Sequence, residues 1–210
     1  MFYAIVCFLI SIFSPVFSLR IIGRENIPRE GGVIIASNHM SYLDIPLLGY
    51  SMFTTGRRAD FMAKKELFSI PVLGFLLRML GGFPIDRAKY DRVALREAVK
   101  RLKAGNMVVI YPEGTRSIDG RLQSGKSGVG LIVKMSSKKV IPVGIKGTDK
   151  ALPVGKWLPK PYPVTITFGE PLDFSNMMEK NDEKSNAEEI TDTIMGNIAA
   201  LIANRQGDMP

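Results

Sequence analysis

The chain has 210 residues, of which 46% are hydrophobic and 23% are charged, so it can form one α/β domain with a buried core and is too apolar to be disordered or fibrous. A single Cys and a single His exclude a disulfide framework and a multi-Cys or His-rich metal site, and we expect no metal. The net charge is +8, yet residues 1–170 carry 25 basic and 12 acidic side chains, and residues 171–210 carry 3 and 8. This basic body favours an anionic partner, and because no nucleic-acid-binding motif is present we expect no nucleic acid.

Residues 1–19 contain no charged side chain, and Arg20 and Arg24 follow them directly. As a helix these nineteen residues would extend about 28 Å, close to the thickness of a bilayer core. A signal peptide would begin with basic residues, which this segment lacks. A spanning helix, a shallow or re-entrant anchor and a buried core helix remain open. We expect this segment to anchor the protein to the membrane, as a monotopic or single-anchor protein with its catalytic body on the cytoplasmic side.

The rest of the chain alternates short β-rich runs with helical patterns. The predicted strands are 32–37, 60–63, 83–85, 107–111, 140–145 and 164–168, and the predicted helices are 44–51, 66–80, 90–103, 129–135 and 187–203. This alternation predicts a single α/β domain with a central mixed or mostly parallel sheet flanked by helices. The expected boundaries are an anchor at 1–19, the domain at 20–174, and a polar linker with a C-terminal helix at 175–210.

The only histidine, His39, follows the first of these strands and lies five residues before Asp44. On one ideal helix this offset would place the two side chains on different faces, so they can meet only if the chain turns between them. Ser41 and Asp44 form a capping-box pattern that supplies such a turn. A free imidazole takes a proton from a hydroxyl near neutral pH, and a carboxylate on its other nitrogen orients it. A purely structural His39, with Asp44 only capping a helix, remains open.

Two further clusters combine arginines with turns at strand ends. Arg87 follows a short predicted strand, and Glu113 and Arg116 follow the turn that closes a strongly apolar strand. Arginines in this position suit bidentate phosphate binding. Residues 120–127 also match the P-loop pattern, which would bind a nucleotide. That mechanism needs a strand leading into the first glycine, and the preceding predicted strand ends about nine residues earlier.

Taken in order, these clusters resemble the four motifs of the glycerophospholipid acyltransferases, most closely the bacterial 1-acyl-sn-glycerol-3-phosphate acyltransferases. Residues 38–44 match Asn-His-x-x-x-x-Asp, and residues 83–87 match an Ile-Asp-Arg-like strand end. Residues 111–117 match Tyr-Pro-Glu-Gly-Thr-Arg-Ser in full, and residues 140–144 match an apolar Ile-Pro-Val strand. The resemblance covers about residues 20–170, and the third motif is quite specific.

The resemblance implies that His39 is the general base on the acceptor hydroxyl and that Asp44 orients it. It implies that Arg87 and Arg116 hold the acceptor's phosphate, and that Pro142 only lines the site. The implied substrate-binding residues are Asn38, Ser41, Arg87, Glu113, Gly114, Thr115 and Arg116. The implied reaction transfers a fatty acyl group to lysophosphatidic acid, giving phosphatidic acid, with no covalent intermediate and no cofactor.

The implied partners are membrane lipids and an acyl thioester of acyl carrier protein or coenzyme A, and the sequence does not select between these donors. Acceptors other than lysophosphatidic acid, such as glycerol-3-phosphate or a lyso-aminolipid, remain an alternative. A nucleotide-binding protein and a non-catalytic lipid-binding protein are further alternatives. An esterase is disfavoured because the chain has no Gly-x-Ser-x-Gly elbow.

Overall fold

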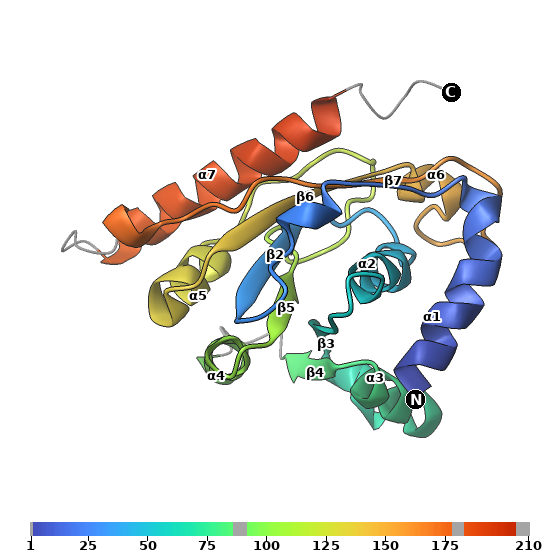
Figure 1. The fold of residues 1–210 in the computed structure, drawn as a ribbon, viewed down its shortest axis with the longest axis horizontal. Helices are drawn as coiled ribbons and strands as arrows, with labels where there is room; N and C mark the ends of the chain where they lie inside the picture. The colour runs from blue at the N-terminus through green and yellow to red at the C-terminus, as the bar shows by residue number, and fades with distance from the viewer. Residues whose placement is uncertain (1, 86–91, 178–182, 205–210) are drawn as a thin grey trace.

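The computed structural model describes residues 2–85, 92–177 and 183–204 (Figure 1). The strands are β1 (Arg20–Ile22), β2 (Val33–Ser37), β3 (Ala59–Lys64), β4 (Gly82–Ile85), β5 (Met107–Ile110), β6 (Val140–Lys146) and β7 (Thr165–Phe168). The α-helices are α1 (Phe2–Phe13), α2 (Asp44–Phe53), α3 (Pro71–Met79), α4 (Arg92–Lys103), α5 (Gly128–Ser136), α6 (Thr148–Ala151) and α7 (Glu183–Ala203). Short 3₁₀ segments are η1 (Ser14–Phe17), η2 (Arg24–Asn26), η3 (Lys65–Ser69) and η4 (Ser175–Met177).

The strands form one sheet in the order β1-β7-β6-β2-β5-β3-β4. β2 pairs in parallel with β5 on one side and with β6 on the other, and among the described pairs only β6 with β7 is antiparallel. All five residues of β2 are buried, as expected for a strand covered by helices on both faces. The predicted α/β domain with a mostly parallel central sheet is confirmed.

Helices cover both faces of the sheet (Figure 1). One core combines Leu47, Leu48 and Met52 of α2 with side chains of the central strands. The other combines the inner faces of α4, α5 and α7 with the opposite sheet face. Because β2 pairs in parallel with both β5 and β6, the carboxyl ends of these three strands lie together at one edge of the sheet. Ligand sites of parallel α/β sheets form at this edge.

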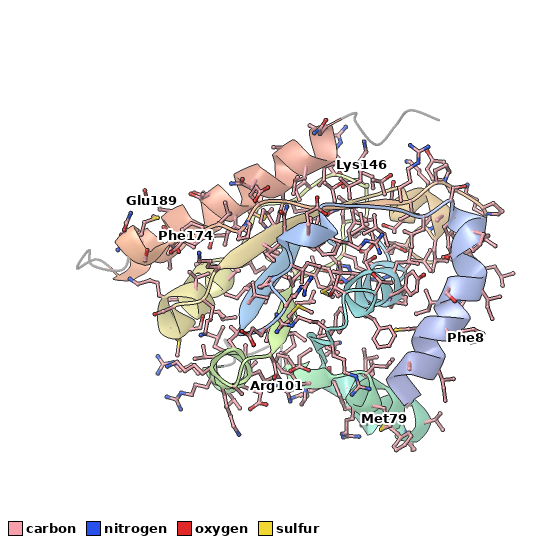
Figure 2. All side chains as sticks on the ribbon, in the orientation of Figure 1. Phe8, Met79, Arg101, Lys146, Phe174 and Glu189 are labelled. Carbon is pink, nitrogen blue, oxygen red and sulfur yellow. The ribbon has the colours of Figure 1, made fainter. Side chains whose placement is uncertain are left out.

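The apolar N-terminal segment forms α1 and η1. Figure 2 shows Phe8 of α1 and Met79 of α3 at the same side of the molecule. The two helices also share an apolar cavity of about 120 Å³, which Cys7, Ile10 and Leu77 help to line. Their outer faces carry exposed apolar side chains, namely Ile5, Phe8, Ile12, Val72, Phe75 and Met79. No helix in the described ranges is both long and apolar enough to cross a membrane. The anchoring role of this segment stays a prediction.

The structure differs from the sequence prediction in several elements. The helix predicted over 66–80 is divided into η3 and α3 at Ile70, whose backbone is extended because Pro71 follows it. The sequence prediction contains neither strand β1 nor the short helix α6. In the segment expected as a linker, η4 forms at its start, and α7 begins at Glu183 rather than Ala187.

Candidate active site

His39 and Asp44 meet directly after β2, where the chain turns into α2. His39 Nδ1 lies 2.8 Å from Asp44 Oδ2, His39 is 5% exposed and Asp44 is fully buried. Since an ionised carboxylate can only accept, the contact places the imidazole proton on Nδ1. Nε2 is then the acceptor nitrogen of the neutral ring, which is the arrangement a general base needs.

One oxygen of Asp44 also organises the turn. Besides the imidazole, Oδ2 accepts the backbone N–H groups of Met40 at 2.7 Å and Ser41 at 2.8 Å. The bond from Ser41 N–H is one half of the predicted capping box. The other half does not form, because Ser41 Oγ accepts the backbone N–H of Leu43 at 3.2 Å rather than that of Asp44. The same hydroxyl donates to Leu152 O at 2.7 Å. Asp44 therefore fixes the loop and the histidine together.

Glu113 connects the loop after β5 to the loop after β2. Its Oε1 accepts the backbone N–H of His39 at 2.7 Å, and its Oε2 accepts that of Gln123 at 2.9 Å. In return, Ser117 N–H donates to His39 O at 2.8 Å. Burial raises the pKa of Glu113, and the two N–H donors oppose that shift. With both oxygens bonded to the backbone, the Glu113 carboxylate serves to hold the histidine loop.

An aromatic ring, which sequence reasoning missed, packs on the histidine. Tyr111 stacks on His39 with ring centroids 4.0 Å apart and an interplanar angle of 17°. Burial, and secondarily the charge of Asp44, raise the pKa of Tyr111 well above its usual value, so the phenol stays neutral. Its hydroxyl finds no hydrogen-bond partner among the described residues. The stacked ring limits the rotation of the imidazole.

Asn38 lies between the catalytic candidates and the sheet. Its Nδ2 donates to Ile145 O at 2.8 Å, and its Oδ1 accepts Ile145 N–H at 2.8 Å. The side chain is fully buried, so it joins the ends of β2 and β6. Asn38 and Ser41 thus lie beside the candidate base with their polar atoms bonded to the backbone.

Of the two arginines predicted to bind phosphate, the structure describes only Arg116. Arg116 stacks on the Tyr42 ring, with its guanidinium carbon 3.6 Å from the ring centroid. Its Nη1 is buried and has no hydrogen-bond partner among the described residues, which leaves a donor for an anion. Thr115 is exposed, and Gly114 has a φ of 73° that favours glycine. Arg87 lies outside the described residues.

Residues 120–127, which match the P-loop sequence pattern, do not form a P-loop. Residues 111–127 contain no strand, and α5 begins only at Gly128. Lys126 instead turns back onto the Glu-Gly-Thr-Arg turn, since its backbone N–H donates to Pro112 O at 2.9 Å. A Cβ atom built on Gly114 would lie 3.1 Å from Lys126 Nζ. Sequence reasoning weighed this lysine only for nucleotide binding, and the fold places its ammonium group beside Gly114, in the turn that carries Arg116.

Open space adjoins the His39 loop. A cavity of about 730 Å³ and a neighbouring one of about 210 Å³ are both lined by Met40, Gly120, Asp149 and Lys150. Within the described ranges, no group of three or more His, Cys, Asp or Glu side chains is arranged to hold a metal ion.

Comparison with known proteins points to one family. A family model described as acyltransferase matches residues 18–146. The crystal structure of the 1-acyl-sn-glycerophosphate (LPA) acyltransferase PlsC from Thermotoga maritima has a TM-score of 0.72 and 34% identity, covering 91% of this chain and 76% of that one.

Two curated relatives are both 1-acyl-sn-glycerol-3-phosphate acyltransferases. The Bacillus subtilis protein is 32% identical over 77% of this chain and 79% of its own length. The chloroplastic protein of Arabidopsis thaliana is 35% identical over 67% of this chain and 39% of its own. The chain thus spans less than half the length of the plant relative.

Proposed function

This chain belongs to the acyltransferase family, and on that premise we propose that it transfers a fatty acyl group from an acyl thioester to lysophosphatidic acid, giving phosphatidic acid. The observation that carries the proposal is the buried His39–Asp44 pair, 2.8 Å apart, at the carboxyl edge of a parallel sheet. Relatives named 1-acyl-sn-glycerol-3-phosphate acyltransferases support the choice of acceptor.

The proposed mechanism is direct transfer. Nε2 of His39 takes the proton of the acceptor hydroxyl while its oxygen attacks the thioester carbonyl. Asp44 stabilises the imidazolium that forms. The tetrahedral intermediate collapses with loss of the thiolate, which takes the proton back from His39. The products are the ester and a free thiol, so no covalent acyl-enzyme and no cofactor are needed.

The proposed acceptor site lies on the loop after β5. Arg116, held over Tyr42, offers a buried guanidinium N–H to the phosphate, and Arg87 is the second proposed phosphate ligand. We assign Asn38, Ser41 and Glu113 to positioning the His39 loop rather than to the substrate, because their polar atoms bond to the backbone. Gly114 and Thr115 shape the turn that carries Arg116.

The acyl chain needs an apolar channel, since each buried CH₂ contributes about 0.8 kcal/mol. The cavity between α1, α2 and α3 is the proposed place, because its lining is almost wholly apolar. The exposed apolar faces of α1 and α3 support membrane association as a monotopic protein. The cytoplasmic side is the proposed location of the body, because Arg20 and Arg24 follow the apolar segment. The thioester of acyl carrier protein or coenzyme A is the proposed donor.

The test is a transfer assay in detergent micelles with radiolabelled lysophosphatidic acid and palmitoyl thioesters. We expect phosphatidic acid from the wild-type protein and at least a hundredfold less from His39→Ala. The same donors offered with glycerol-3-phosphate or a lyso-aminolipid test the alternative acceptors. Equal turnover by the wild-type protein and His39→Ala would refute the assignment of the base, and turnover only with another acceptor would refute the choice of lysophosphatidic acid.

A further inference from the structure

The loop between α6 and β7, residues 153–163, presents an uncovered apolar tip. Trp157 is 94% exposed and Leu158 is 85% exposed. Single apolar side chains on a surface are ordinary, but an adjacent Trp and Leu that no described element covers leave a contact surface. Ile118, also 85% exposed, lines the same cavity as Val154 of this loop and enlarges the apolar area.

The exposure is built into the loop. Lys160 N–H donates to Ala151 O at 2.8 Å, and Val164 N–H donates to Phe17 O at 2.8 Å. Prolines at positions 153, 159, 161 and 163 fix the backbone further. Lys156 N–H closes a turn onto Pro153 O at 3.1 Å, directly before the tryptophan. The tip is therefore presented outward by a restrained backbone.

The charge of the loop suits an anionic surface. Between residues 150 and 169 the chain has three lysines, Lys150, Lys156 and Lys160, and no acidic residue. Two of these lysines flank the Trp–Leu tip. Tryptophan side chains are enriched at the interface between water and the lipid headgroups, and basic side chains there bind anionic lipids. A tryptophan with neighbouring lysines is therefore suited to this interface.

The loop continues the apolar surface of the N-terminal segment. The bond from Val164 N–H to Phe17 O joins the end of the loop to η1, where Val16 is half-exposed. Figure 1 shows the loop beside the end of α1 that is farther from the N-terminus. At its other end, the loop reaches the candidate site, because Ser41 Oγ donates to Leu152 O.

We propose that residues 153–163 are a second membrane-contacting element, with Trp157 and Leu158 inserted among the headgroups of an anionic bilayer. The inference extends the membrane association proposed above, but it rests on the loop and not on α1. Contact at this loop places the cavities beside Met40 at the bilayer surface, where an amphiphilic acceptor presents its headgroup.

The test uses the intrinsic fluorescence of the full chain, because Trp157 is its only tryptophan. We expect phosphatidylglycerol-rich vesicles to shift the emission to shorter wavelength and brominated lipids to quench it, with a weaker response to pure phosphatidylcholine. The matched control is Val93→Trp in a Trp157→Phe background, which moves the reporter to an exposed position on α4. An unchanged Trp157 emission, or an equal response at position 93, refutes the proposal.

Two further measurements separate the outcomes. The double variant Trp157→Ala, Leu158→Ala should bind these vesicles about tenfold less tightly in a sedimentation assay. Transfer activity is measured in parallel in micelles. A Trp157 response without turnover by the wild-type protein would overturn the acyltransferase proposal alone, and turnover without a response would overturn the loop proposal alone. A response to acyl carrier protein but not to vesicles would overturn the bilayer in favour of a protein partner.

Discussion

Replacing Asp44 with Asn should abolish most of the proposed transfer, because three N–H donors converge on one oxygen of this residue. The donors are His39 Nδ1–H, Met40 N–H and Ser41 N–H, at 2.8, 2.7 and 2.8 Å from Oδ2. If the amide oxygen of Asn takes that position, the donors keep an acceptor but the imidazolium loses its counter-charge. If the amide nitrogen takes it, an NH₂ group opposes three donors. Either orientation weakens the base.

The magnitude follows from burial. Asp44 is fully buried and His39 is only 5% exposed, so water cannot compensate for the lost negative charge. Breaking a buried pair by removing one charge costs about 3–5 kcal/mol. If this cost falls on the state in which His39 is protonated, kcat/KM drops by roughly 10²–10⁴, at about 1.4 kcal/mol for each factor of ten. Initial rates with lysophosphatidic acid and a palmitoyl thioester measure it.

The matched control is Asp119→Asn in the neighbouring loop. Asp119 also accepts hydrogen bonds, from Ser117 Oγ at 3.0 Å and Arg121 N–H at 3.1 Å, but it is exposed. We expect this variant to stay within about threefold of the wild-type rate, since exposed surface substitutions cost little. A folded Asp44→Asn protein, with wild-type circular dichroism and kcat/KM within tenfold of wild type, would refute the reasoning that His39 depends on this carboxylate.

Three further variants test other contacts of the site. Arg116→Ala should raise KM for lysophosphatidic acid about 10–100-fold and change kcat less, because it removes a charged hydrogen bond to the phosphate of the acceptor. Arg121→Ala, at an exposed position, is its control, and an equal rise of KM in both variants would contradict the role assigned to Arg116. Glu113→Gln should lower the free energy of unfolding by about 1–3 kcal/mol in urea melts, because one carbonyl cannot replace two carboxylate oxygens that accept backbone N–H groups. Because the pKa of Glu113 is raised, the folded protein binds a proton at this carboxylate more tightly than the unfolded chain does. The difference in free energy of unfolding between the wild-type protein and Glu113→Gln should therefore grow as the pH falls from neutral. A difference that shrinks would contradict the argument that burial raises this pKa. Leu77→Trp should move the donor preference to shorter acyl chains by narrowing the cavity between α1 and α3, and an unchanged chain-length profile would place the acyl chain elsewhere.

The sequence predicts well the elements that are determined by the pattern of residues within their own segment. β5 is a run of apolar residues that ends before Pro112, and all four of its residues are buried. β1 was missed because three residues carry no periodic pattern, and the strand exists through its pairing with β7, as in Ile21 with Ile166. That pairing joins segments about 145 residues apart, which no local pattern records.

The same division applies to the candidate site. The His39–Asp44 contact is predictable because five residues with a turn between them leave few other geometries. The contacts of Tyr111 and Glu113 with His39 are not, because they depend on β2 and β5 being neighbours in register, with Ala36 opposite Ile110. The pairing of Asn38 with Ile145 likewise requires that β6 lies on the other side of β2.

The acidic tail shows why composition misjudges a segment that packs on the sheet. In α7 the acidic residues Glu188, Glu189 and Asp192 are exposed, while Ile190, Ile194 and Ile198 are fully buried against α5 and β6. Ile194→Ala should therefore lower the free energy of unfolding by about 2–5 kcal/mol. The neighbouring Thr193→Ala, at an exposed position, should change it by less than about 0.5 kcal/mol. Equal stability of the two variants in urea melts would mean that α7 is a peripheral tail, and a large loss only in Ile194→Ala would make α7 part of the domain that holds β6, and with it Asn38 and His39, in place.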